Sequence, residues 1–551
     1  MSSTPRTQPE HLNGVDLAFA DPPRNLAVAP EPASRARTML DLCSERDLVR
    51  SEVLMGDPAK IEAQHAKGKL TARERITLLL DEGTFFETEI LRKHRGAGLM
   101  SGNTDRPHTD GVVTGSGEIH GRPVFVYAQD FTILGGSLGE SHAAKIQKTI
   151  DRATKCGAPI ISLLDSGGAR IQEGAHSLDG YGGIFKRTVD ASGVIPQISV
   201  ILGPCAGGAA YAPALTDFTF MVRDVSYMYL TGPDVVAAVN GHTVTHDELG
   251  GPTLHSTSSG VAAFVYDDEA DCLSDVRFLV SMLPANYLDV PPSLAACGAT
   301  SDVRPVFRDL VPVEPRVVYD MSAVVAELVD DGDFLEVHEN WARNVVCGLA
   351  RIDGAVVGIV ANQPQYLAGA LDADGAQKAS RFVRFCDAFN IPLVTLVDVP
   401  GFLPGLEQER LGAIRHGAKL LYAFCEATVP RVQVIVRKAY GGAYIVMDSR
   451  SIGTDLSLAW PTTEVGVMGA AAAVNVLHRR ELATSPNPAG LRSELEARYE
   501  ALSTPYLPAE EGFVDDVIDP AQTRAVVARG LAMLRSKRGA APDRKHGNLP
   551  L

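Results

Sequence analysis

Two pairs of adjacent glycines are the residues of this sequence best suited to chemistry. Gly207 and Gly208 follow the apolar run QISVILGPCA, and Gly441 and Gly442 follow VQVIVRKAY. A backbone amide binds an oxyanion only where no side chain blocks its approach, and glycine in a tight turn at a strand end meets that condition. One such donor lowers a reaction barrier by about 3 kcal/mol. The two pairs therefore predict two sites that stabilise a developing negative charge on oxygen.

An aspartate at the end of an earlier apolar strand accompanies each pair. IISLLDSGGAR places Asp165 before Gly167 and Gly168, and LVTLVDVPGFLPG places Asp398 before Gly401. Each glycine pair follows its aspartate at nearly the same distance, so one pattern occurs twice. A single Gly-Gly pair is usually only a tight turn. The repetition of the whole unit favours two copies of one fold with amides exposed at strand ends.

The segments around these units repeat in the same order. LTARERITLLLDEGTFFETE predicts a helix that begins at a Thr71–Glu74 capping box and ends before Gly83, and DMSAVVAELVDDGDFLEVHENW opens the second half in the same way. GVVTGSGEIHGRPVFVYAQD and CGLARIDGAVVGIVANQP alternate as β-hairpins do. A helix that ends near Gly157 leads into the buried strand APIISLLD. Strands that alternate with helices predict an α/β fold.

The length of 551 residues exceeds what one hydrophobic core usually supports. We predict a flexible leader at residues 1–40, an N-terminal domain at 41–295 and a C-terminal domain at 296–551. The predicted linker is LPANYLDVPPSLAACGATSDVRPV, which is dense in Pro and small residues. The leader is rich in Pro, Ser, Ala and Thr and lacks the hydrophobic segment of a secretory signal.

The composition argues against several classes of function. The formal net charge of −16 has the wrong sign for a general nucleic-acid surface. No apolar run is long enough to cross a bilayer, so we expect no membrane contact. The cysteines form no CxxC pair, which argues against a metal site or a disulfide framework and favours a reducing, cytoplasmic setting; they are Cys43, Cys156, Cys205, Cys272, Cys297, Cys347, Cys386 and Cys425.

Five long motifs resemble the carboxyltransferase (beta) subunit of biotin-dependent acyl-CoA carboxylases, especially the propionyl-CoA carboxylase type. In order they are DSGGARIQEG, GVIPQISVILGPCAGGAAYAPALTDF, LVDVPGFLPG, RHGAKLLYAF and RKAYGGAYIVMDS. The resemblance runs from about residue 60 to the terminal KHGNLPL. It implies two tandem crotonase-like (ClpP/crotonase ββα-superhelix) domains. It also implies a hexameric homo-oligomer whose active sites lie at a dimer interface, between the N-terminal domain of one subunit and the C-terminal domain of another.

In the first half, the resemblance implies binding of the acyl-CoA thioester. The Gly168/Ala169 turn and the Gly207/Gly208 pair are the candidates for holding its enolate. In this family type the biotin nitrogen left after loss of CO2 takes the α-proton. The reaction therefore needs no side chain as base.

In the second half, the resemblance implies binding of carboxybiotin. The amides of Gly442 and Ala443 would face the ureido carbonyl of biotin, and Gly441 would supply the room for its approach. Tyr444 completes the predicted biotin site.

Three further side chains follow the glycine pairs. Tyr211 and Tyr444 occupy equivalent places and are candidates for lining the two pockets, with core packing as the alternative. Asp448 is a candidate for the border of the acyl pocket, where it would influence chain-length preference. Its alternative is a purely structural role.

The other titratable residues near these turns are expected to be structural. Asp165 and Asp398 are predicted to accept backbone hydrogen bonds and to shape their loops. Glu173 as a base, as in hydratases of the crotonase superfamily, is the less favoured alternative. His416 is predicted to be a hydrogen-bonded helix residue, and Cys205 a small buried residue. For the CoA phosphates the candidates are Arg170, Lys145 and Lys148, and the sequence does not choose among them.

The implied reaction moves a carboxyl group from carboxybiotin on a partner subunit to the α-carbon of an acyl-CoA, with propionyl-CoA favoured. The sequence contains neither an Ala-Met-Lys-Met stretch to carry biotin nor an ATP-binding glycine loop. A biotinylated alpha subunit, with biotin carboxylase and biotin carrier functions, is therefore implied. ATP, bicarbonate and magnesium would enter only through this partner.

Three alternatives stay open. The carboxyltransferase subunit of a decarboxylase or transcarboxylase would share these motifs. A stand-alone hydratase or hydrolase would need only one such domain and a side-chain acid or base. A non-catalytic scaffold would be expected to lose its glycines. The acyl chain length is also open, because NGHTVTHDELGG carries His242 and His246 where the family has acidic or small residues.

Overall fold

The computed structural model describes residues 37–95, 106–539 and 542–550. The chain divides into two compact units, Met1–Glu52 and Val53–Leu551. In the first unit the described part is almost entirely helix α1, which spans Met39–Met55 and ends in the second unit. The predicted leader at residues 1–40 therefore lies almost entirely outside the described residues.

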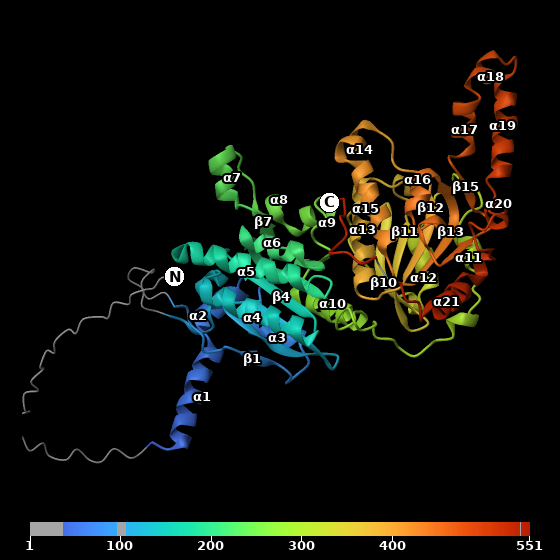
Figure 1. Ribbon diagram of the computed structural model, residues 1–551. Coiled ribbons are helices and arrows are strands. Elements are labelled where there is room, and N and C mark those ends of the chain that lie inside the picture. Colours follow the sequence, from blue (N-terminus) through green and yellow to red (C-terminus); the bar gives the residue numbers. More distant parts are fainter. Residues whose placement is uncertain (1–36, 96–105, 540–541, 551) are drawn as a thin grey trace, which may run out of the picture. The chain divides into compact units, whose positions relative to one another are not determined.

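In the part of the chain that the structure describes, the larger unit contains two eight-stranded sheets, and they share one strand order (Figure 1). The first sheet runs β1-β2-β3-β4-β5-β6-β8, with β7 paired to β5, and the second runs β9-β10-β11-β12-β13-β14-β16, with β15 paired to β13. In each sheet the first three strands pair antiparallel with their neighbours, and all later pairings are parallel. This topology confirms the predicted α/β repeat.

The strand bounds place the predicted hairpins at β2–β3 and β10–β11. The first sheet contains β1 (Phe86–Thr88), β2 (Val112–Ile119), β3 (Arg122–Gln129), β4 (Ile160–Ser166), β5 (Gln197–Ala206), β6 (Phe218–Val222), β7 (Tyr227–Tyr229) and β8 (Phe264–Tyr266). The second contains β9 (Phe334–Glu336), β10 (Val345–Ile352), β11 (Ala355–Asn362), β12 (Leu393–Val399), β13 (Arg431–Tyr440), β14 (Leu456–Ala459), β15 (Glu464–Gly466) and β16 (Asp516–Val517).

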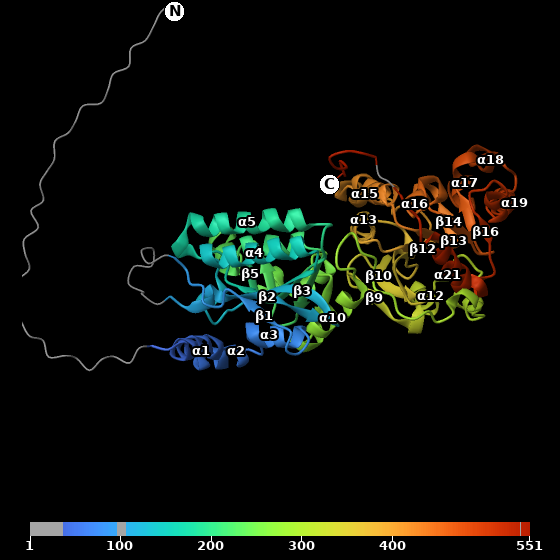
Figure 2. The same cartoon turned by 60° about the horizontal axis from the view of Figure 1, so that its bottom comes forward.

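Helices cover both faces of each sheet in the same arrangement (Figure 2). One face carries α4 (Glu140–Cys156) and α5 (Ala175–Ala191) in the first half, and α13 (Ala373–Ala388) and α15 (Ala413–Glu426) in the second. The other face carries α3 (Ala72–Leu79) and α10 (Glu269–Met282), or α12 (Met321–Leu328) and α21 (Thr523–Leu534). The remaining helices are α2 (Pro58–His65), α6 (Gly208–Leu215), α7 (Pro233–Asn240), α8 (His246–Gly250), α9 (Pro252–Thr257), α11 (Phe307–Leu310), α14 (Leu406–Leu411), α16 (Gly441–Val446), α17 (Ala470–Leu477), α18 (Arg479–Thr484), α19 (Pro488–Leu502) and α20 (Tyr506–Glu510).

Local sequence signals explain where several of these elements begin and end. Thr71 and Glu74 form the predicted capping box at the start of α3. Helix α4 ends as predicted at Gly157, whose φ of 63° is left-handed. Strands β4 and β12 are buried along their whole length, as parallel strands between two helical layers must be.

The hydrophobic core continues from one half into the other. Phe218 of β6 packs edge-on against Phe385 of α13, with ring centroids 4.6 Å apart. The backbone amide of His338 donates to the carbonyl oxygen of Ala263 at 3.0 Å. We call this boundary between the two sheets with their helices the seam. It is held by aromatic packing and by main-chain hydrogen bonding.

The predicted linker at residues 283–306 contains the single 3-10 turn Ala299–Ser301 as its regular structure. The domain boundaries predicted at residues 40/41 and 295/296 stay predictions. Among the described residues, no helix is both long and apolar enough to span a bilayer.

Candidate functional site

In the first half, strand β5 runs into helix α6 through Gly207. Its φ of +61° is left-handed, and its amide donates to the carbonyl oxygen of Tyr229 at 3.1 Å. The next two amides, of Gly208 and Ala209, lie in the first turn of α6, where no helical acceptor exists. Neither amide has a hydrogen-bond acceptor among the described residues. This pair of donors is therefore available to a ligand.

In the second half, strand β13 runs into helix α16 through Gly441. The φ of Gly441 is +59°, and a Cβ atom there would lie 3.0 Å from the carbonyl oxygen of Val467. The amides of Gly442 and Ala443 belong to the first turn of α16 and, within the part of the chain that the structure describes, donate to nothing. A Cβ atom at Gly442 would meet open space. A second pair of donors thus stands at the equivalent strand end.

The strand registers decide which residues of the two turns correspond. The β4–β5 and β12–β13 pairings place residues 208–209 in register with residues 442–443, and Gly207 in register with Gly441. The amide of Gly207 is already bonded within the fold and is not an available donor, while the place of the Gly207/Gly208 pair at the enolate stays a prediction. Ala209 replaces Gly207 as the available donor. An alignment of AGGAAY on YGGAYI would have identified it from the sequence.

The same registers correct the predicted equivalence of the two tyrosines. Tyr211 corresponds to Ile445, and Tyr444 corresponds to Ala210. Tyr211 is 53% exposed and packs edge-on against Phe185. Tyr444 is partly buried against the core. That either tyrosine lines a reactant pocket stays a prediction.

The Gly168/Ala169 turn follows β4 and lies against the end of β5. A Cβ atom at Gly168, whose φ is +95°, would lie 3.0 Å from the carbonyl oxygen of Ala206. The amide of Gly168 donates to Oγ of Ser166 at 3.1 Å, so it is not available. The amide of Ala169 has no acceptor among the described residues. Ala169 is the candidate donor that this turn retains.

Asp165 anchors the end of β4 in a buried ion cluster. Its carboxylate lies 2.6 Å from the ammonium of Lys69 and 3.0 Å from the guanidinium of Arg75, which also pairs with Glu269 at 2.7 Å. Burial lowers the pKa of Lys69, although the charge of Asp165 opposes this shift. The carboxylate is thus held by side-chain cations. The prediction that it accepts backbone hydrogen bonds is wrong, because α3 and the turn before it bring cations to the strand end, and α2 adds the side-chain amide of Gln64 at 3.0 Å.

Asp398 holds the corresponding position in the second half. Its carboxylate lies 3.1 Å from the guanidinium of Arg437 and accepts the hydroxyl of Tyr319 at 2.9 Å. It also accepts the backbone amide of Lys438 at 3.0 Å, which is the predicted backbone bond. In both halves the strand register shifts at this aspartate. Such a bulge changes the strand direction just before the glycine turn.

The amide of each strand-end aspartate is held as well. Asp165 donates its N–H to the side-chain oxygen of Gln129, and Asp398 donates to that of Asn362, both at 3.2 Å. Gln129 ends β3 and Asn362 ends β11, so the acceptor comes from the preceding strand in both halves. The repeat therefore extends to the side chains that position the loops.

Two of the three candidate cations for the CoA phosphates are internal. Arg170 is buried and pairs with Asp110 and Glu173, each at 2.7 Å. Lys145 is buried and donates to the carbonyl oxygens of Thr109 and Val112. Both charges are used inside the fold, which argues against these two candidates. Lys148 is half exposed and pairs with Glu89.

The remaining candidates near the turns have structural surroundings. Glu173 pairs with Arg170 and accepts the amide of Glu140 at 2.7 Å, so it is not a free base. Cys205 is fully buried, and burial raises its pKa to about 12, which confirms a small buried thiol. Burial lowers the pKa of His416. It is a helix residue of α15 whose Nε2 is hydrogen-bonded with the guanidinium of Arg415 at 3.5 Å, as predicted, while its Nδ1 has no partner among the described residues.

Asp448 is fully buried behind the second glycine turn. Its carboxylate lies 2.8 Å from the guanidinium of Arg431. Burial raises the pKa of Asp448 to about 7, although Arg431 opposes the shift. This environment favours the structural alternative, and a contact with the acyl group stays a prediction.

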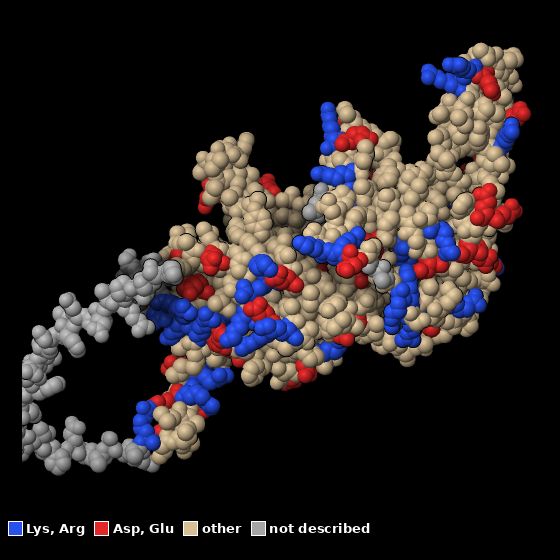
Figure 3. Space-filling model, in the orientation of Figure 1, with Lys and Arg blue, Asp and Glu red and all other residues tan. Residues whose placement is uncertain are grey.

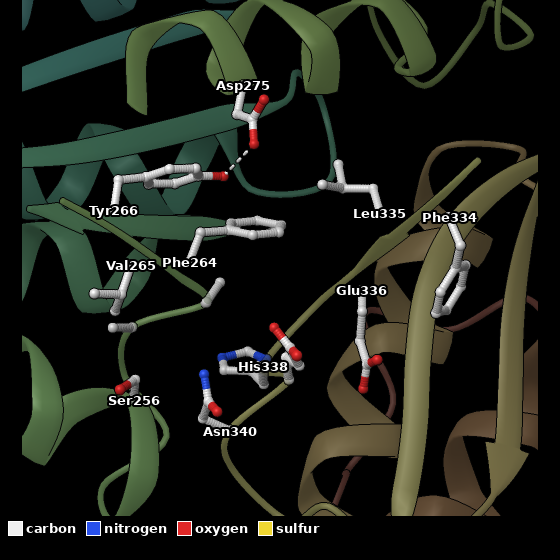
Figure 4. Close-up of a pocket in the computed structure, with 13 residues that line it drawn as sticks. Ser256, Phe264, Val265, Tyr266, Asp275, Phe334, Leu335, Glu336, His338 and Asn340 are labelled. Carbon is white, nitrogen blue, oxygen red and sulfur yellow. Dashed lines mark hydrogen bonds between the residues drawn. The ribbon is translucent and has the colours of Figure 1, made fainter. Parts of the chain in front are cut away.

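Two cavities lie along the seam, and neither is lined by a residue of the glycine turns. The smaller, of about 410 Å³, lies between the edge strands β8 and β9 (Figure 4). Asp275, Glu336 and Glu339 line it, and the hydroxyl of Tyr266 donates to Asp275 at 2.7 Å. An acidic cavity repels the phosphates of an acyl-CoA. The candidate reaction site is therefore the pair of glycine turns, outside both cavities.

Basic and acidic side chains are interspersed on the face of the molecule in Figure 3. A nucleic-acid-binding face would instead gather its Lys and Arg side chains into one patch. Within the described ranges, no group of three His, Cys, Asp or Glu side chains could hold a metal ion.

The ion cluster beneath the first turn predicts the effect of Arg75→Met. The change leaves Glu269 buried without its partner and should lower the free energy of unfolding by about 3–5 kcal/mol, measured by chemical denaturation. The control Lys186→Met removes an exposed pair with Asp190 and should cost less than about 1 kcal/mol. Equal losses in the two variants would show that the cluster does not stabilise the strand end.

Glu336 in the acidic cavity predicts a pH dependence of stability. Burial raises its pKa from 4.5 to about 7, although Lys378 opposes the shift. Between these values the folded protein keeps a proton that the unfolded chain has lost, so stability should fall as pH rises. Glu336→Gln should flatten this slope in unfolding measurements from about pH 5 to 8. The neighbouring Glu339→Gln controls for the loss of one charge, and an unchanged slope in Glu336→Gln would contradict the prediction.

Comparison with known proteins gives a consistent result. The Carboxyl transferase domain family matches residues 63–549. The chain is 54% identical to the propionyl-CoA carboxylase, carboxyltransferase subunit, of Haloferax mediterranei, over 93% of this chain and 100% of that protein. It is 48% identical to methylmalonyl-CoA decarboxylase subunit alpha of Propionigenium modestum, over 94% of this chain and 99% of that protein.

Among solved structures, the hexameric transcarboxylase 12S with methylmalonyl-coenzyme A bound superposes with a TM-score of 0.90. It is 47% identical and covers 94% of this chain and 100% of its own. The two repeated sheets described above are thus tandem crotonase-like carboxyltransferase domains. The chain belongs to the carboxyl transferase domain family.

Proposed function

We propose that this chain is the carboxyltransferase subunit of an acyl-CoA carboxylase and that it carboxylates the α-carbon of propionyl-CoA. One observation carries the proposal: at the same strand end, each half presents two adjacent amides that have no acceptor among the described residues. A reaction that develops negative oxygen on two reactants needs two such donor pairs. The similarity to a propionyl-CoA carboxylase subunit supports the substrate.

In the proposed mechanism the first half stabilises the substrate enolate. The amides of Gly208 and Ala209 donate to the thioester oxygen, with the amide of Ala169 as a further candidate. Negative charge builds on this oxygen as the α-proton leaves, so the donors bind the enolate more strongly than the thioester. The enolate carbon is then the nucleophile that accepts the carboxyl group.

The second half holds biotin in the same way. The open space at Gly442 fits a ligand that approaches its main chain, and the amides of Gly442 and Ala443 would donate to the ureido oxygen. Biotin supplies the carboxyl group when bound. No side-chain base is part of the proposal: the biotin nitrogen freed of its carboxyl group would accept the α-proton. The ion pairs that occupy Asp165, Asp398 and Glu173 support the absence of a side-chain base.

We further propose that a second copy of the chain completes each reaction site, in a hexamer with its active sites at dimer interfaces. Large apolar side chains flank both turns in an exposed state: Ile171 is 90% exposed and Val467 is 82% exposed. Apolar surface of this kind beside a polar donor pair is typical of an interface. The hexamer of transcarboxylase 12S supports the same assembly.

The proposal also requires a biotinylated alpha subunit that consumes ATP, bicarbonate and magnesium. We place the complex in a reducing compartment such as the cytoplasm, since each of the eight cysteines is a free thiol. The similarity to a methylmalonyl-CoA decarboxylase subunit supports a second candidate, in which the same site runs the transfer in reverse.

The direct test combines the purified chain with its biotinylated partner, ATP and labelled bicarbonate. A series of acyl-CoAs from acetyl- to long-chain is offered, and we expect most label in propionyl-CoA. If carboxybiotin forms but no acyl-CoA accepts label, the proposed function is wrong. Release of CO2 from methylmalonyl-CoA without ATP-dependent fixation would favour the decarboxylase.

Gly442→Val tests the second donor pair. The new side chain meets open space within the chain, so folding should be preserved while the ligand is kept away from the amides. Label transfer should fall about 100-fold or more, the loss expected when an oxyanion donor is removed. The matched control is Gly182→Val, which also meets open space and should retain activity. Normal transfer by Gly442→Val would remove this turn from the mechanism.

A further inference from the structure

The larger cavity of the seam lies away from both glycine turns. Its volume is about 570 Å³. Thr216 and Gly260 line it from the first half, and α13 and α15 line it from the second. Arg381 and Arg384 of α13 are exposed at its wall, so the cavity communicates with solvent. A ligand there would touch both halves of the chain at once.

The charges of this cavity are strongly unbalanced. Lys378, Arg381, Arg384 and Lys419 line it against a single carboxylate, that of Asp217. Arg384 is neutralised by Glu426 outside the cavity lining, and Lys378 donates to two carbonyl oxygens. The other two cations, Arg381 and Lys419, have no such carboxylate partner.

Arg381 and Lys419 form no ion pair with any described residue. Arg381 uses one Nη atom to donate to the carbonyl oxygen of Thr216. The pKa of Lys419 is lowered by burial and by the nearby charge of Arg415, one helical turn away on α15. Like charges at this spacing destabilise a helix. A bound anion would relieve the repulsion and use the guanidinium donors that Arg381 keeps free of carboxylates.

A neutral donor in the same wall also lacks a partner. Trp341 lines the cavity, and its buried indole Nε1 has no acceptor among the described residues. A buried donor left unpaired costs about 1–3 kcal/mol. An oxygen atom of a ligand is one acceptor that would satisfy it. This observation is independent of the charges and points to the same kind of ligand.

The neighbouring cavity is lined by negative charges, so the positive charge is confined to the larger cavity. The cavity in Figure 4 is lined by three carboxylates, and His338 belongs to both linings. Burial lowers the pKa of His338 to about 3, so the shared imidazole is neutral near pH 7. The two cavities also meet at an ion contact, because Lys378 of the basic lining lies 3.9 Å from Glu336 of the acidic lining.

We propose that the basic cavity is a binding site for a small organic anion with two or more negative oxygens, either phosphate or carboxylate. Arg381 and Lys419 bind the anionic groups, while Phe385 and Phe389 contact an apolar body. The described tail reaches this cavity with the apolar Leu549, which cannot neutralise the cations. Because the site bridges the halves, its occupant clamps them together. The proposal is independent of the carboxyl-transfer reaction.

The intrinsic fluorescence of Trp341 offers a direct test. The chain has two tryptophans, and Trp460 is fully buried beneath α21, where it donates to Thr523. Pyrophosphate and malonate are titrated separately into the purified full-length protein, with sodium chloride at matched ionic strength as the reference. Pyrophosphate represents phosphate ligands and malonate represents carboxylate ligands. We expect a saturable change in emission with at least one of them, and a higher unfolding temperature in its presence.

Variants distinguish a site from general charge screening. Arg381→Gln combined with Lys419→Gln should weaken the response about tenfold or more. The control pair Lys186→Gln and Arg223→Gln removes the same charge from exposed positions and should bind as the wild type does. Trp341→Phe should lose the optical signal and, because Arg381 and Lys419 remain, keep part of the thermal stabilisation. A response that chloride reproduces, that does not saturate, or that survives in the Arg381/Lys419 double variant would overturn the proposal.

Discussion

A main-chain amide that is to bind an oxyanion must be held rigidly and yet be bonded to nothing in the protein. The first turn of a helix provides such amides, because its leading N–H groups have no helical acceptor. In both halves a parallel strand leads directly into that helical turn, and the residue between them is a glycine with positive φ, Gly207 or Gly441. The glycine uses the left-handed conformation so that the two residues after it can present their amides. Hydrogen bonds and ion pairs at the preceding strand ends hold the chain next to these turns.

The buried aspartates are the main part of that support. Asp165 and Asp398 stand at the register shift of neighbouring strands, and each is held by a buried arginine. A carboxylate in this position would be costly without its cation, so the pair specifies where the strand ends. Their burial also removes them as acids or bases. Buried charge thus positions the strand ends, and main-chain amides are left as the proposed polar contacts with the reactants.

Much of this could be predicted from the sequence, because the signals are local. The capping box at Thr71, the end of α4 at Gly157 and the repeated order of strands and helices depend on neighbouring residues. The sequence comparison of the two glycine turns could have indicated Ala209, but that the amide of Gly207 is bonded to Tyr229 is visible only in the structure. The surroundings of Asp165 and Arg170 were also missed, since their partners come from distant segments.

The sequence by itself determined the duplication, the α/β class and the kind of chemistry, because hydrophobic periodicity and the positions of glycines are local features of the sequence. Only the tertiary structure decided which amides are free and which cations are already used, since each depends on partners brought together by the sheets and helices. It also decided the character of the seam. The acidic cavity at Glu336 and the basic one at Arg381 form where residues from the two halves meet. No local sequence pattern predicts which residues of the two halves are in contact.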